Sequence, residues 1–256
     1  MLKLSHLLAI AFATALTSGA VQAGQPFETE SARLPKKGHG NVQMVAEYLT
    51  SSEEKANAFP VVLEYGITDR LRLKIEPTLF ASVRPKGARH GNGFGVTEVI
   101  LTYLVAEESG GRPALALAGE LVIPTNKNPL LGSGSTDFRI FGILSKQVGN
   151  VDIHSNIGFT KAGSFQGSKN PNAIDYSLAA EVKLHPKWSL TTEVTGETLT
   201  GGGPSTATAV GETSGSVITG MIGFIHRPNE HFEWALATTY DNNSTFLVKT
   251  GFTFRF

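Results

Sequence analysis

The side chains best suited to catalysis lie close together near the middle of the sequence, at Asp152, His154, Ser155 and Asn156. These residue types can support nucleophilic catalysis, in which a histidine removes the proton of a serine hydroxyl. They belong to an alternating segment that predicts a β-strand, and neighbouring strand residues point to opposite faces. His154 and Ser155 therefore point apart. We expect His154 to be a polar residue of an enclosed interior, so an enzyme acting on membrane lipid ranks only third among the functions considered.

Metal, cofactor and nucleic-acid chemistry have no matching pattern. Cysteine is absent, which excludes disulfides, thiolate ligands and thiol nucleophiles. The seven histidines are scattered without the spacing of metal ligands. The glycine-rich residues 91–95 and 201–203 precede no helical pattern, so they are predicted to be external loops and not phosphate cradles. Acidic and basic residues balance at 22 each, which argues against a nucleic-acid partner.

Charged side chains recur at every second position of several apolar segments. In residues 71–79 the odd positions are apolar, whereas Arg72, Lys74 and Glu76 share the other face. This period of two predicts strands with one apolar and one polar face. If the polar faces point inward, acids outnumber bases in the lumen, whose predicted lining residues are Glu47, Glu64, Arg72, Lys74, Glu76, Glu98, Glu120, Asp137, Arg139, His154, Glu181, Lys183, Glu193 and Lys249.

The alternating segments are long enough to cross a membrane. Most run ten to twelve residues, against about five or six for an ordinary strand and nine to eleven for a tilted membrane strand. Residues 216–226 are too apolar on both faces to assign an inward side. The twelve predicted segments are 41–50, 59–68, 71–80, 95–105, 114–123, 136–147, 151–161, 173–184, 188–198, 216–226, 232–241 and 245–256.

The connections between these segments alternate in length, apart from a short last hairpin. Short turns separate longer loops, which are predicted at 51–58, 81–94, 124–135, 162–172 and 199–215. Outer-membrane barrels have short periplasmic turns, long external loops and an even number of strands. The sequence therefore predicts an all-β, transmembrane, antiparallel up-and-down barrel of about twelve strands. Its first and last strands must pair, and both chain ends are expected on the periplasmic side.

Aromatic residues support this placement in the outer membrane. They cluster near both strand ends, as in the girdles that contact the two membrane interfaces. In the last segment, Phe252, Phe254 and Phe256 share one face and end the chain. This face is expected to contact lipid and to carry the signal for the barrel assembly machinery.

The N-terminal part does not follow the strand pattern. Lys3 and the apolar residues 7–16 precede a small-residue site at 21–23, which predicts an export signal over residues 1–23. Residues 24–40 are expected either to hang in the periplasm or to enter the lumen as a plug. As a plug, Arg33, Lys36 and Lys37 would offset the excess of acids in the barrel of residues 41–256.

Short stretches between residues 60 and 160 carry a family resemblance. They are 64–71, 75–77, 113–120, 124–125, 134–137, 144–146 and 154–158. Together they resemble the family of outer-membrane proteins named for the MetA-pathway of phenol degradation. The resemblance implies a barrel and passage of aromatic or other hydrophobic compounds, and it assigns no binding residue.

Two functions remain open at this point. The first is a passive outer-membrane channel for a small solute, without catalysis or cofactor. The second is a structural or surface-interaction barrel with a closed lumen, acting through loops 81–94 and 199–215. Twelve strands lie between the packed eight-stranded barrels and the open sixteen-stranded porins, so strand number does not decide between them.

Overall fold

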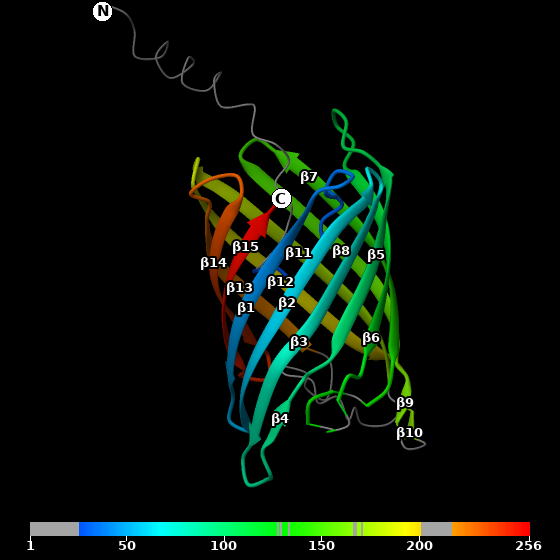
Figure 1. Cartoon of the computed structure of the whole chain (residues 1–256), viewed down its shortest axis with the longest axis vertical. Coiled ribbons are helices and arrows are strands. Elements are labelled where there is room, and N and C mark those ends of the chain that lie inside the picture. Colours follow the sequence, from blue (N-terminus) through cyan, green and yellow to red (C-terminus); the bar gives the residue numbers. More distant parts are fainter. Residues whose placement is uncertain are drawn as a thin grey trace, which may run out of the picture.

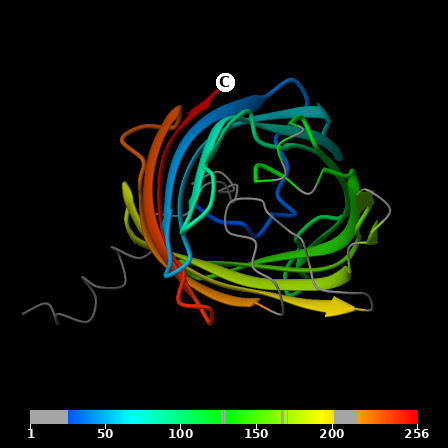
Figure 2. The same ribbon diagram turned by 90° about the horizontal axis from the view of Figure 1, so that it is seen from below.

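The computed structural model describes residues 26–126, 128, 130–132, 134–165, 168–169, 171–200 and 217–256. The chain forms a closed antiparallel β-barrel (Figure 1, Figure 2). Its wall consists of β1 (Gly40–Thr50), β2 (Glu54–Thr68), β3 (Leu71–Pro85), β5 (Thr97–Ala106), β6 (Ala114–Ile123), β7 (Asp137–Val148), β8 (Val151–Lys161), β11 (Asn172–His185), β12 (Trp188–Thr200), β13 (Val217–His226), β14 (Phe232–Asp241) and β15 (Phe246–Arg255).

Each wall strand pairs with its neighbours in sequence, and β1 closes the barrel against β15. Their antiparallel register runs from Asn41 opposite Arg255 to Thr50 opposite Phe246. Hydrocarbon cannot satisfy a free backbone N–H or C=O, so a strand edge exposed to lipid would cost several kcal/mol per group. The predicted twelve-stranded up-and-down barrel and its closure are confirmed.

The two faces of the wall have opposite character. Large apolar side chains such as Leu117 and Ile157 are exposed on the outside, whereas Arg72, His154 and Lys249 are buried inside. This is the reverse of a soluble protein and suits an outer face bathed in lipid. In β13, which the sequence left unassigned, Met221 and Ile225 point inward. Among the described residues, no helix has the length and apolarity needed to span a bilayer.

The barrel has a short-turn end and a long-loop end. We call the half of the interior nearer the turns at 69–70, 149–150 and 186–187 the short-turn half, and the other the long-loop half. Aromatic side chains are exposed on the outer surface near both ends. Tyr65, Tyr103 and Trp188 lie near the short turns, and Phe80, Phe159, Tyr176, Tyr240 and Phe246 near the long loops.

The predicted long loops differ from the structure in three places. Residues 51–58 are not a long loop, because β2 already begins at Glu54 and leaves only residues 51–53 as a turn. Within 81–94, β3 continues to Pro85 and the short strand β4 (Gly91–Gly93) pairs with it. Within 162–172, β9 (Ser164–Phe165) pairs with β10 (Ser168–Lys169). The loop at 199–215 lies mostly outside the described residues, as does the predicted export signal.

Candidate functional site: the barrel interior

The chain segment before β1 lies inside the barrel, as Figure 2 shows in dark blue. We call residues 26–33 the inner segment. Ala32 N–H donates to Ser145 Oγ at 2.9 Å. The side chain of Asn156 accepts from Glu30 N–H at 2.7 Å and donates to Glu30 C=O at 3.0 Å. Barrel side chains thus satisfy backbone groups of the inner segment, which has no partner strand of its own.

Ion pairs add to these contacts. Glu30 accepts from Arg72 and Lys74 of β3, at 2.8 Å each. Four strands further around the wall, Arg33 donates to Asp152 of β8 at 2.5 Å. The inner segment is therefore fastened across the lumen to strands far apart around the wall. Glu28 pairs with Lys249 of β15, Arg33 also reaches Glu108, and Thr29 N–H donates to Glu193 of β12 at 2.6 Å.

Paired charges fill the short-turn half. Arg227 lies in the turn after β13 and reaches into this half, donating to Glu181 at 2.5 Å and to Glu233 at 2.6 Å. Arg72 similarly donates to Glu64 at 3.0 Å. Burial acts to lower the pKa of Arg227, but Glu233 and Glu181 outweigh burial and raise it, so the guanidinium stays charged. Removing Arg227 would leave the buried Glu181 without its cation.

A serine–histidine contact lies in the same half. Ser145 and His154 are directly opposite on β7 and β8, and Ser145 Oγ lies 2.8 Å from His154 Nδ1. His154 Nε2 lies 3.7 Å from Asp152 Oδ2. In the sequence analysis, Ser155, which neighbours His154 on the same strand, was considered, whereas Ser145 on the adjacent strand was not identified. Because Ser145 is buried and its hydroxyl bonds the inner segment through Ala32, the arrangement serves to hold that segment.

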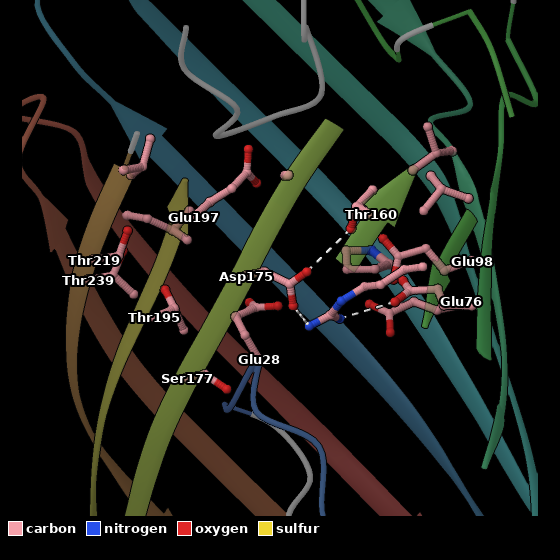
Figure 3. Close-up of a pocket in the computed structure, with 18 of the residues that line it drawn as sticks. Glu28, Glu76, Glu98, Thr160, Asp175, Ser177, Thr195, Glu197, Thr219 and Thr239 are labelled. Carbon is pink, nitrogen blue, oxygen red and sulfur yellow. Dashed lines mark hydrogen bonds and ion pairs between the residues drawn. The ribbon is translucent and has the colours of Figure 1, made fainter. Parts of the chain in front are cut away.

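The long-loop half contains a cavity of about 570 Å³. Figure 3 shows Glu76, Glu98, Asp175 and Glu197 converging on it from different strands, with Glu28 of the inner segment. Eleven carboxylates line it, namely Glu28, Glu30, Glu47, Glu76, Glu98, Glu120, Asp137, Asp175, Glu193, Glu197 and Asp241, against only three bases, Lys74, Arg139 and Lys249. The cavity therefore favours positive charge.

The bases do not neutralise all of these acids. Arg139 donates to Glu120 at 3.1 Å and also pairs with Asp175, and Lys74 lies 3.1 Å from Glu76. The side-chain carboxylates of Glu47, Glu98 and Glu197 form no ion pair or hydrogen bond with any residue that the structure describes. All three side chains line the cavity.

Part of the cavity wall is apolar. Leu49, Ala58, Ala81, Leu131 and Leu247 line it together on the side of β1, β2 and β3. Leu49, Ala81 and Leu131 belong to one buried apolar cluster. The cavity therefore offers an apolar surface beside its acidic residues.

The comparisons with known proteins agree with this architecture. The family described as "Putative MetA-pathway of phenol degradation" matches residues 23–256. The chain belongs to this family. No curated protein matches the sequence.

Solved structures resemble this member of the phenol-degradation family in fold. A COG4313 outer membrane channel from Pseudomonas putida F1 is 16% identical, with a TM-score of 0.62, covering 91% of this chain and 100% of its own. The NanC porin is 8% identical, with a TM-score of 0.59 and coverage of 83% and 98%. The KdgM porin, 7% identical, has a TM-score of 0.52 and the same coverage. The chain thus has the fold of these outer-membrane β-barrels.

The predicted lumen residues separate into two groups in this family member. Glu47, Lys74, Glu76, Glu98, Glu120, Asp137, Arg139, Glu193 and Lys249 line the cavity. Glu64, Arg72, His154 and Glu181 are buried in the short-turn half. Lys183 is half-buried near the short turns and does not line the cavity.

Some interior residues were missed by the sequence prediction. Asp175, Glu197 and Asp241 line the cavity near strand ends. The alternation that selected Glu181 and Glu193 would have reached Asp175 and Glu197, which lie on the same strands at even spacing. Arg227 lies in a turn, where alternation gives no signal. Of the bases expected to offset the acids, only Arg33 does so, because Lys36 and Lys37 are exposed. Within the described parts of the chain, no group of acids or histidines is arranged to hold a metal ion.

Proposed function

We propose that the protein is a passive outer-membrane channel, with both chain ends on the periplasmic side, and that the inner segment closes it. The observation that carries this proposal is the cavity, which is lined by acids on the long-loop side and bounded by the inner segment. That segment is held by side-chain hydrogen bonds and ion pairs and not by strand pairing. It can therefore move without breaking the wall of the barrel.

The cavity lining narrows the class of solute. A neutral aromatic or hydrophobic compound, as the family name suggests, gains nothing from unpaired carboxylates such as Glu98 and Glu197. A small cation with an apolar or aromatic body would match both the carboxylates and the apolar wall around Leu49 and Leu131. We therefore propose small organic cations as the preferred solutes.

Conductance in planar bilayers tests the channel. Asn156→Leu removes two hydrogen bonds to Glu30 and should loosen the inner segment, so we expect more frequent openings and cation-selective current. Thr191→Val is the matched control, because the buried Thr191 hydroxyl has no partner to lose. Heat-modifiable migration on gels verifies that each variant is a folded barrel.

The cavity bounded by the inner segment also supports a second function. If the wild type and Asn156→Leu are both folded and both silent, the inner segment is a permanent filling. The protein is then a surface-interaction barrel with a closed lumen.

The last strand is proposed to carry the assembly signal. Phe252, Phe254 and Phe256 are all exposed on the outer surface of the barrel. Replacing Phe256 with Ser should lower the amount of assembled barrel in the outer membrane, measured as the heat-modifiable form. An equal amount would remove Phe256 from the signal.

A further inference from the structure

The two longest strands form an extension at the long-loop end. β2 and β3 have 15 residues each, and in Figure 1 β3 and β4 project below the rest of the barrel. On the outer face of this extension, Lys55 is directly opposite Arg84 in the antiparallel register. Like charges in this position repel each other and destabilise the pair of strands. An anion bound between the two bases would offset this repulsion.

No carboxylate of the described chain supplies that anion. Lys55, Arg84, Lys86 and Arg89 are exposed and form no ion pair with a residue that the structure describes. Glu54 is next to Lys55 on the strand and therefore points to the opposite face. We call these four bases the basic extension.

An aromatic pair shows the depth of the basic extension relative to the membrane. Phe59 and Phe80 lie on the same outer face of the same strands, with ring centroids 6.1 Å apart. Lys55 lies four positions before Phe59, which is roughly 13 Å along a strand. With the tilt of barrel strands, the bases stand about 10 Å beyond the aromatic girdle. Since such girdles mark the membrane interface, the bases are level with lipid headgroups.

We infer that the basic extension binds the phosphate groups of lipopolysaccharide, the anionic glycolipid of the outer leaflet. The four bases come from β2, β3 and the turn after β3, so they present several cations to one phosphorylated headgroup. Charge-assisted bonds from Arg and Lys to phosphate are among the stronger polar contacts. This interaction needs the long-loop end to face outward, but it does not need the lumen to open.

The test measures binding of labelled lipopolysaccharide to the full-length protein in zwitterionic detergent. Each base near an anionic surface contributes about fivefold in affinity (~1 kcal/mol). Lys55→Gln with Arg84→Gln should therefore weaken binding roughly twentyfold. Lys161→Gln is the control, because Lys161 is exposed at the same end of the barrel on β8, away from the extension. It should change binding less than twofold.

Two further arms identify the ligand group. Enzymatically dephosphorylated lipopolysaccharide should bind the wild type at least as weakly as the intact lipid binds the double variant, because Lys86 and Arg89 remain in that variant. Inorganic phosphate at millimolar concentration should compete poorly. Binding of the double variant within twofold of the wild type would overturn the inference. Full competition by inorganic phosphate would also overturn it, by showing a site for free phosphate.

Lys55→Glu separates lipid binding from strand stability. Glu opposite Arg84 forms an attractive cross-strand pair, so the extension should be at least as stable as in the wild type. Lipopolysaccharide binding should nevertheless fall by tenfold or more. If Lys55→Glu binds as well as the wild type, the two bases do not recognise phosphate.

Discussion

The two halves of the barrel interior use the same residue types in opposite ways. In the short-turn half, Arg72 and Arg227 each bridge two carboxylates; Arg72 and the carboxylates are almost completely buried, and Arg227 is partly buried. In the long-loop half, three bases face eleven carboxylates around a cavity. The inner segment lies between them and bonds to both. In the proposed channel, pairing serves closure in one half, whereas excess charge remains available to a solute in the other.

The largest expected effect is the loss of a paired base from the short-turn half. Arg72→Met removes a buried cation that pairs with both Glu64 and Glu30, so the free energy of unfolding should fall by about 3 kcal/mol or more. Glu98→Gln removes an unpaired cavity carboxylate and should cost less than about 0.5 kcal/mol. Urea unfolding in micelles measures both. Equal decreases in the free energy of unfolding would show that charged residues contribute equally to stability in the two halves.

The next effect concerns selectivity. In the Asn156→Leu background, replacing Glu47, Glu98 and Glu197 with Gln removes the three unpartnered carboxylates. The ratio of cation to anion permeability, from the reversal potential in a salt gradient, should drop several-fold. Glu230→Gln changes an exposed acid in a short turn and should leave the ratio unchanged. An unchanged ratio in the triple variant would mean that these acids do not face the conducting path.

A smaller effect on stability is expected from the titration of Glu108, which pairs with Arg33 at the end of the inner segment. Burial acts to raise the pKa of Glu108, but Lys146, the Gln147 N–H and Arg33 outweigh it and lower the pKa below 4.5. The ionised carboxylate therefore stabilises the fold above that pH, and its contribution is lost as pH falls through the lower, folded-state value. The urea midpoint should fall between pH 7 and pH 3 more steeply in the wild type than in Glu108→Gln. If the urea midpoints of the wild type and Glu108→Gln fall in parallel with pH, the carboxylate of Glu108 does not contribute to stability in this way.

The smallest effect is expected at the exposed neighbour of Glu108. Glu107 lies 3.9 Å from Arg70, and both side chains are more than half exposed. Solvent-exposed pairs contribute about 0–1 kcal/mol. Glu107→Gln should therefore leave the urea midpoint within error at every pH. A clear fall in the urea midpoint would show that the network of stabilising ion pairs extends beyond the barrel interior.

The wall of the barrel could be predicted from sequence, because the alternation of apolar and polar residues along a strand indicates which side chains face inward. It placed Arg72, Lys74 and Glu76 on one inner face, and the structure agrees. The position of the inner segment could not be predicted, since a segment without periodicity is located by partners distant in sequence, such as Asn156. The same limit applies to Arg227, whose long side chain reaches inward from a turn. The start of β2 was missed because Lys55 and the two inward alanines before Phe59 resemble a loop in composition.

The movement of the inner segment is tested most directly by locking it. The chain has no cysteine, so Ser31→Cys with Ser145→Cys introduces a single pair, at a point where Ser31 Oγ lies 3.5 Å from Ser145 Oγ. Single-channel conductance is then recorded in planar bilayers before and after adding a reductant. We predict no current in the oxidised barrel and cation-selective openings once the disulfide is reduced. Identical current in both states would contradict a channel closed by residues 26–33.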